Sequence, residues 1–292
     1  MEPGRRFTHK YSFLEPKLEE LRKLSTLVMD GDGVAKRHGR VLYILSTKVV
    51  EGLLNTLVQF YDMVYRCFTF SYYQLLPTLE EYANLVGIPV SNKISFTSLE
   101  EIPKSKEIAS ILHLKKTEAT YFATAGSMAA FEDILALLVY GLVLFPNINN
   151  FVDVNAIWIF MIKKPILTLL GNTYHSIHLR TDNRKGIIVC CASFLYRWFI
   201  SHLLDTRAFW DNKECLRWSQ RIIYLTSYDI EWYSHDYFYT KIIDSCGRFS
   251  NVPLLGTQGG INYNPILARR QMGYPLNDKP GNLLVEGFFS MI

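Results

Sequence analysis

Polar and apolar residues recur along this chain with the spacing of amphipathic helices, most clearly in residues 73–90, YQLLPTLEEYANLVGIPV. Thr78 and Glu81 have capping-box spacing, in which a hydroxyl and a carboxylate satisfy the first free amides of a helix. An apolar stripe follows at Leu79, Tyr82, Leu85 and Val86. Gly87 and Pro89 are stop signals. The segment therefore predicts a complete helix with both ends defined.

The same periodicity predicts helices along most of the chain. They cover residues 15–28, about 41–65, 104–116, 127–145, 153–162, 168–179, 187–204, 212–225 and 264–273. Ser127 is the predicted N-cap of a long apolar helix that ends at Phe145. In the last helix Asn264 is the predicted cap, Pro265 takes the first helical position and Gly273 ends it.

Composition favours one large domain. A chain of 292 residues with 49% hydrophobic content can bury a sizeable core, and no Pro/Gly/Ser-rich linker divides it. Residues 232–243 are dense in Tyr, Phe and Ile and predict a short strand. We therefore expect a mainly α fold: a single compact multi-helix domain over residues 1–292 with a few short strands or hairpins. Residues 1–14 are expected to form a flexible N-terminal arm.

Charge, hydropathy and cysteine usage exclude several classes of protein. A net charge of +4 is too small to imply attraction of the whole surface to nucleic acid. The uninterrupted apolar run of residues 134–145 falls short of the ~20 residues that span a bilayer, so no membrane contact is expected. Five cysteines without a CxxC pair predict neither a disulfide framework nor a zinc ribbon. We expect an intracellular protein with reduced thiols.

Six blocks of sequence carry a family resemblance that extends over most of the chain. They are GLLNTLVQFYD (52–62), CFTFSYYQLLPTLEEYANLVGIPV (67–90), EDILALLVYGLVLFPNINNFVDVNAI (132–157), TYHSIHLRT (173–181), CLRWSQRI (215–222) and GRFSNVPLLGTQGGINYNPILARRQMGYP (247–275). In this order they resemble the plant mobile domain, and most closely its legume branch, which is uncharacterised and linked to mobile elements. The number and order of the blocks make the match specific, although each block alone is weak.

The resemblance implies an association with transposable elements and, as in host-domesticated members, a nuclear role in silencing. Relatives carry more sequence between the segment near Leu114 and the block that begins at Ala125, and they are expected to continue beyond Ile292. This chain therefore resembles a truncated or degenerate copy. The family is also labelled aminotransferase-like. No lysine here has the Gly/Ser-rich context of a pyridoxal phosphate site, so no cofactor is expected.

The segment LVMDGDGV (27–34) resembles the first motif of haloacid dehalogenase-like phosphotransferases. In that interpretation Asp30 would be the nucleophile and Asp32 the acid/base beside magnesium. The preceding residues are helical in pattern rather than β-rich, and no matching later lysine and paired aspartates follow. Two acids between glycines also make a good turn, which is the favoured interpretation.

Two further patterns have a structural and a functional interpretation. His175 and His178 lie at i and i+3 on a predicted helix and could face a metal, but no third ligand is evident, and packed histidines are favoured over a metal site. Gly256, Gly259 and Gly260 suggest a phosphate loop, but no Lys-Ser/Thr pair follows. A turn that leads to the cap at Asn264 is favoured for these glycines.

Basic residues form two candidate contact regions for nucleic acid or a partner. Lys36, Arg37, Arg40 and Lys48, with His38, lie in a region without acids, and Arg269 and Arg270 lie on the last helix. Such residues contact phosphates in nucleic-acid-binding proteins, although a solvated helix face is the favoured interpretation.

The sequence therefore predicts no catalytic, cofactor-binding or metal-binding residue. Our first hypothesis is a non-enzymatic helical interaction domain with protein partners. A nucleic-acid-binding or transposition-related protein is the alternative, and a haloacid dehalogenase-like phosphatase is a remote one.

Overall fold

The computed structural model describes residues 10–90, 128–183, 185–212, 214–232, 242–243 and 252–273. The α-helices in these ranges are α1 (Glu19–Ser25), α2 (Gly31–His38), α3 (Val41–Leu45), α4 (Glu51–Leu57), α5 (Leu79–Val86), α8 (Met128–Val139), α9 (Val154–Ile162), α10 (Ile166–Asn183), α11 (Ala192–Ser201), α12 (Thr206–Asp211), α13 (Trp218–Tyr224) and α14 (Pro265–Gln271). A 3-10 turn, η1 (Val58–Phe60), follows α4, and a π-helical turn, η2 (Tyr140–Leu144), extends α8.

The strands are short and form three small sheets. They are β1 (Lys10–Phe13), β2 (Tyr61–Asp62), β3 (Cys67–Thr69), β4 (Gln74–Leu75), β5 (Lys185–Ile188), β6 (Val252–Leu255) and β7 (Gly260–Tyr263). β1 pairs with β5 in parallel, β2, β3 and β4 form an antiparallel sheet, and β6 and β7 form an antiparallel hairpin. The predicted fold class, mainly α with a few short strands, is confirmed.

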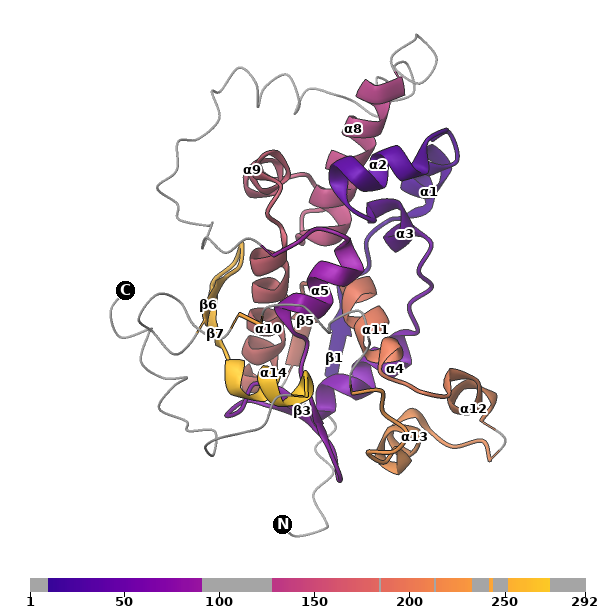
Figure 1. Cartoon of the computed structure of the whole chain (residues 1–292), viewed down its shortest axis with the longest axis vertical. Coiled ribbons are helices and arrows are strands. Elements are labelled where there is room, and N and C mark those ends of the chain that lie inside the picture. Colours follow the sequence, from indigo (N-terminus) through magenta and orange to yellow (C-terminus); the bar gives the residue numbers. More distant parts are fainter. Residues whose placement is uncertain are drawn as a thin grey trace.

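Helix α10 lies at the centre of the molecule (Figure 1). It packs against α5, β5 and both strands of the β6–β7 hairpin. At one end α8 packs against α1, α2 and α3, and at the opposite corner α12 and α13 stand out from the body. One continuous cluster of buried side chains, from Tyr11 to Ala268, joins these parts. No helix in the described part of the chain is long and apolar enough to cross a membrane.

Two sequence predictions at the parallel pair are wrong. Residues 10–13, assigned to a flexible arm, form β1 in register from Lys10↔Lys185 to Phe13↔Ile188. Residues 187–204, predicted as one helix, begin as the end of β5 and become helical only at Ala192. The physical reason is the run of β-branched residues at Ile187, Ile188 and Val189, which favours an extended chain.

Two long helix predictions are also wrong because side chains break the helix. Residues 41–65 form α3, α4, η1 and β2 rather than one helix. Ser46 Oγ donates to Tyr43 O (2.7 Å), a local bond that competes with helix propagation. Residues 212–225 are helical only from Trp218, because Asn212 ties a turn to Leu216 through bonds of 2.7 and 3.0 Å.

The predicted caps are confirmed wherever the structure describes them. Thr78 and Glu81 form a reciprocal capping box, and Gly87 ends α5 in the left-handed conformation (φ 73°). Asn264 caps α14, with Pro265 at its first position. Residues 128–144 form the predicted apolar helix. Its predicted cap at Ser127, the helix at 104–116 and most of the strand at 232–243 lie outside the described residues.

Candidate functional site

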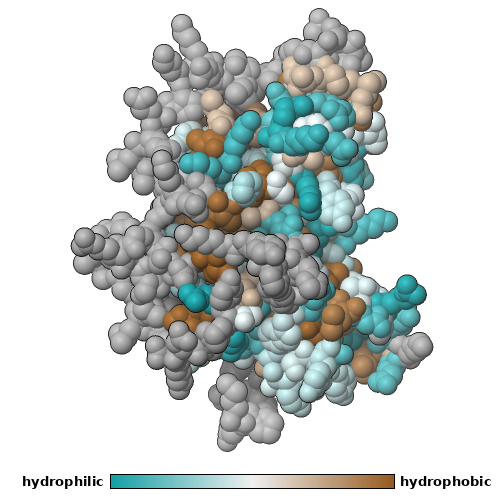
Figure 2. All heavy atoms as spheres, in the orientation of Figure 1, coloured by the Kyte–Doolittle hydropathy of each residue, from teal (hydrophilic) through white to brown (hydrophobic). Residues whose placement is uncertain are grey.

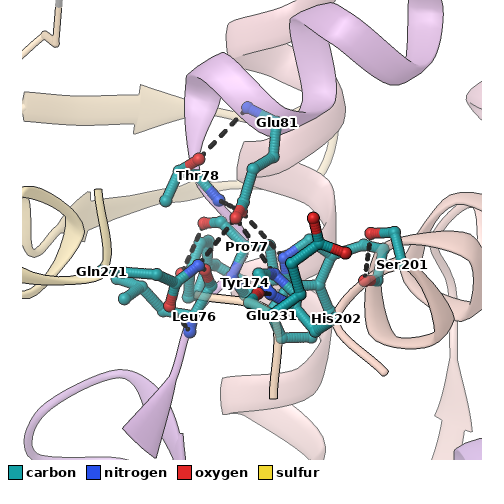
Figure 3. A network of polar contacts seen from close by, with 10 residues as sticks. Leu76, Pro77, Thr78, Glu81, Tyr174, Ser201, His202, Glu231 and Gln271 are labelled. Atoms are coloured by element: carbon teal, nitrogen blue, oxygen red, sulfur yellow. Dashed lines mark hydrogen bonds and ion pairs between the residues drawn. The ribbon is translucent and has the colours of Figure 1, made fainter. Parts of the chain in front are cut away.

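The segment before α5 is fixed by side chains from distant helices (Figure 3). Gln271 on α14 pairs with Leu76 as a strand would, because its Oε1 accepts from Leu76 N and its Nε2 donates to Leu76 O, both at 2.9 Å. Tyr174 on α10 donates to Pro77 O at 2.9 Å. The backbone that leads into Thr78 therefore has its polar groups satisfied by residues far away in sequence.

Glu81 is the centre of this buried polar network. Its Oε2 accepts hydrogen bonds from Thr78 N (2.9 Å) and Trp198 Nε1 (2.8 Å). Its Oε1 accepts one from Gln271 Nε2 (2.8 Å) and lies 3.0 Å from His202 Nε2. Three of these four partners, Thr78 N, Trp198 Nε1 and Gln271 Nε2, can only donate, and this favours the ionised form of the carboxyl, which accepts from all three.

His202 carries the opposite charge. Its Nδ1 lies 2.8 Å from Glu231 O, and since a carbonyl oxygen only accepts, Nδ1 must donate. The Glu81 carboxylate 3.0 Å from Nε2 favours a proton on that nitrogen as well, which makes His202 an imidazolium. The Nε2 and Oε1 atoms are at ion-pair distance but lack the alignment of a hydrogen bond.

The pKa values of the pair shift in opposite directions. Burial alone would raise the pKa of Glu81, but the charge of His202 and the bonds from Thr78 N and Gln271 bring it below its ordinary value. Burial alone would lower the pKa of His202, but the charge of Glu81 and the carbonyl of Glu231 raise it. The ion pair therefore stabilises the native state.

This ion pair predicts a pH dependence of stability. The stability that protonated His202 contributes is complete below about pH 6.5, the pKa of histidine in the unfolded chain. It is lost as the pH rises through the higher pKa of His202 in the folded protein. We expect the difference in free energy of unfolding between wild type and His202→Gln to shrink from pH 6 to pH 9, measured by urea denaturation. His38, His175 and His178 have lowered pKa values and give the opposite slope, but both proteins share them. A difference that does not change over this range would contradict the assignment.

Glu80, beside Glu81, is a second buried carboxyl with a different environment. Its Oε1 accepts from Ile243 N at 2.8 Å, and its Oε2 is buried with no hydrogen bond in the structure. Burial raises its pKa. From the sequence alone, Glu81 is predicted only as part of a capping box, and neither glutamate is predicted to lie in the interior. Because Glu80, Glu81 and His202 are all at least 95% buried, a substrate has no access to them, and the network acts as a structural centre.

Asp30 has the geometry of a helix cap. Asp30 Oδ1 accepts from Gly33 N at 2.8 Å and caps α2, and residues 31–33 form its first turn rather than a separate loop. Asp32 is exposed in that turn. Asp30 thus has the position of a helix cap and follows helix α1, whereas the phosphotransferase motif places its aspartate at the end of a strand.

His175 and His178 face different elements. The ring of His175 packs against Gly259, where a Cβ would clash with it. The ring of His178 lies edge-on to the ring of Tyr61, with the two ring centroids 6.3 Å apart. Burial lowers the pKa of both. Within the described ranges, no group of three or more His, Cys, Asp or Glu side chains could hold a metal ion.

The glycines of residues 256–260 form the predicted turn. Gly256 N donates to Gly259 O (2.8 Å) and closes the β6–β7 hairpin, and β7 leads directly to the cap at Asn264. Asn172 on α10 holds the turn, since its Oδ1 accepts from Thr257 N (2.7 Å) and its Nδ2 donates to Thr257 Oγ1 (3.1 Å).

The first basic region is opposed by acids from α8. Arg37 Nη2 forms an ion pair with Glu132, and His38 Nε2 lies 2.7 Å from Asp133 Oδ1. The sequence within this region contains no acid, because these partners lie almost a hundred residues away in the chain. His38 also stacks on Phe160 with a ring separation of 5.1 Å.

The remaining basic residues are dispersed. Arg40 packs along Gly87, whereas Lys36 and Lys48 are exposed. Arg270 on α14 donates to Gln74 Oε1 at 2.9 Å, and its neighbour Arg269 is partly buried. The candidate residues therefore do not form one basic surface.

A pocket of about 740 Å³ lies between α12, α13 and the loop after α13; we call it the α12–α13 pocket. Its apolar lining includes the buried Leu203 and Phe209 and the partly buried Leu216 and Leu225. Its charged lining consists of Asp205, Arg207, Asp211, Glu214, Arg221 and Asp229. The volume is within the range of pockets that hold small ligands or single side chains, about 300–1,000 Å³.

A strained loop shapes one wall of this pocket. Asn212 and Cys215 have positive φ values of 37° and 53°. Asn212 stabilises the loop through its bonds with Leu216. Arg221 reaches across and donates to Phe209 O (3.1 Å) and Leu216 O (3.3 Å). Non-glycine residues in this conformation cost about 1–3 kcal/mol each and cluster at functional sites.

Large apolar side chains are exposed around the pocket. Tyr224, which lines the pocket, is 65% exposed, and Leu204 (59%) and Tyr228 (88%) are adjacent in sequence to lining residues, as is Ile223 on α13. Figure 2 shows hydrophobic atoms at the surface in this lower corner, over α12 and α13, among hydrophilic ones. The continuous helix predicted for residues 212–225 does not include this surface, which depends on the loop before Trp218.

The fold and this surface define a mainly α domain that encloses a buried glutamate–histidine pair and exposes an apolar pocket at one corner. A family described as a domain of unknown function (DUF7745) matches residues 21–120 and 116–291, and the chain belongs to this family. No curated protein and no solved structure matches the chain. The resemblance to the plant mobile domain stays a prediction.

Proposed function

We propose that this chain is a non-enzymatic helical interaction domain and that a protein partner binds at the α12–α13 pocket. The observation that supports this most is the exposure of apolar side chains at the pocket: Tyr224 in its lining, and Tyr228 and Leu204 next to lining residues in sequence. Clusters of exposed apolar residues beside a cavity are typical of protein-binding surfaces. The buried Glu81–His202 pair supports the same proposal, because its polar groups stabilise the fold rather than face a substrate.

The proposed setting comes from the sequence resemblance. A domain of the plant mobile domain kind would act at transposable elements in the nucleus, with partners involved in silencing. Imaging of the tagged full chain tests this part separately, and exclusion from the nucleus would contradict it. Binding to duplex DNA that weakens steeply with salt and with reversal of Arg37 and Arg40 would instead support the nucleic-acid alternative.

A peptide-display selection on the purified chain tests the proposed surface. We expect enriched peptides to lose at least about tenfold in affinity for Tyr224→Ser, because the ring supplies apolar contact area at the pocket mouth. Tyr72→Ser is the matched control, since Tyr72 is 72% exposed on the β3–β4 hairpin. Equal affinity for wild type and Tyr224→Ser, or no enrichment of any peptide, would contradict the proposal.

A further inference from the structure

The charges around the α12–α13 pocket indicate which kind of partner fits it. Among the described residues that line the pocket, four are exposed acids, Asp205, Asp211, Glu214 and Asp229, and two are cations, Arg207 and Arg221. This described lining therefore has more acids than cations, although the whole chain carries a net charge of +4. A locally acidic rim on a basic protein selects partners by charge complementarity.

Arg221, one of the two cations, is held in place by contacts within the domain and does not neutralise the acids at the rim. Arg221 lies at the pocket wall, where its guanidinium donates to two backbone carbonyls and stacks 4.2 Å above the Trp218 ring. Its position is fixed by these contacts. Asp211 precedes the strained loop and Glu214 lies within it, and both are exposed, so they can meet charges on an incoming chain.

The interior of the pocket sets the second requirement. Leu203, Phe209, Leu216 and Leu225 give it apolar walls, and the rings of Tyr224 and Tyr228 lie exposed nearby. An aliphatic or aromatic side chain gains free energy by leaving water for such a surface.

We infer that the occupant is a basic peptide segment in which one large apolar side chain is flanked by Lys or Arg residues. The apolar side chain enters the α12–α13 pocket and the flanking cations meet Asp211 and Glu214. This inference rests on the proposed function and adds the chemistry of the partner. It predicts that binding requires both the apolar side chain, which contacts the pocket interior, and the flanking cations, which contact the acidic rim, and each requirement can be tested separately.

Cys215 provides a direct reporter for this site. Cys215 is exposed and lies between the lining residues Glu214 and Leu216. Cys67, Cys190 and Cys191 are buried, and burial raises the pKa values of their thiols. With Cys246 replaced by Ser, an environment-sensitive fluorophore on Cys215 reports binding of synthetic peptides. The probes are peptides with a central Trp flanked by Lys, the same peptides flanked by Glu, and Lys-flanked peptides with a central Ala. Calorimetry on the unlabelled protein checks that the label does not create the signal.

We expect saturable binding only of the Lys-flanked Trp peptide, with an affinity that falls as salt rises. The double reversal Asp211→Lys, Glu214→Lys should weaken it by about tenfold, equivalent to losing two rim ion pairs and adding repulsion. Asp32→Lys with Glu19→Lys is the matched control, because it makes the same charge change on α1 and α2 at the other end of the molecule.

The outcomes separate the two proposals. If Glu-flanked peptides bind as well as Lys-flanked ones, or the rim reversal leaves affinity unchanged, the inference is wrong while the proposed surface stands. If no Trp peptide binds and the display selection also enriches nothing, both are wrong. Binding that the control reversal weakens as much as the rim reversal would show general electrostatic attraction and would also overturn the inference.

Discussion

Replacing Glu81 by Ala is expected to lower the free energy of unfolding by about 3–5 kcal/mol. The substitution removes the acceptor that faces Thr78 N, Trp198 Nε1 and Gln271 Nε2, and it leaves the His202 imidazolium buried without a counter-charge. Loss of one partner of a buried ion pair is costly because the other charge stays desolvated. Urea denaturation followed by tryptophan fluorescence measures the change.

Two variants show whether this cost comes from the charge. Glu81→Gln keeps the size and one acceptor oxygen but brings an amide hydrogen toward the donors, so its cost should lie between those of wild type and Glu81→Ala. Glu19→Ala changes an exposed glutamate on α1 and should stay within about 0.5–1 kcal/mol of wild type. A loss below about 1 kcal/mol for Glu81→Ala would contradict a central role for the network.

Replacing Trp198 by Ala is expected to cost a similar amount, about 3–5 kcal/mol. Trp198 is fully buried on α11, where its ring packs against Phe68 with centroids 5.6 Å apart and its Nε1 donates to Glu81. The substitution creates a large cavity and also removes one donor from the carboxylate. Trp198→Phe separates these contributions, since it keeps an aromatic ring and loses only the donor with part of the volume.

A double-mutant cycle measures the coupling between these two residues. Trp198→Phe should cost more in wild type than in the Glu81→Ala background, because the hydrogen bond exists only when Glu81 is present. Equal costs in both backgrounds would show that Trp198 contributes through packing alone.

The local elements of this fold could be predicted well from sequence. The ends of α5 and α14 depend on residues within four positions of each other, such as Thr78 with Glu81 and Asn264 with Pro265. Capping and period are local properties, so one sequence is enough to identify them. The strand β5 and the interrupted helices differ from the prediction because β-branched residues and short side-chain bonds overrode the apolar period there.

The buried network could not be predicted, for a different reason. Glu81 and His202 are each ordinary in their own segment, and only the fold brings them within 3.0 Å. The one available signal was the pair Trp198 and His202, two side chains with N–H donors one helical turn apart in an otherwise apolar stretch. It indicates that α11 presents donors to the interior but not which acceptor they meet. The α12–α13 pocket could not be predicted either, because the bonds between Asn212 and Leu216 interrupt a stretch whose apolar period predicts a continuous helix.

The bond between Gln271 and Leu76 also has a consequence for the order of events during synthesis. Leu76 is made early, but the amide that satisfies its backbone comes from α14, near the end of the described chain. Until that helix leaves the ribosome, the backbone before α5 must bond to water, and the site that receives Glu81 and His202 stays open. Contacts between residues this distant form slowly, since a long loop must close first. We therefore expect the nascent chain to expose α8 and α9, both strongly apolar helices, before its centre is sealed, and we expect chaperones to bind them in that interval.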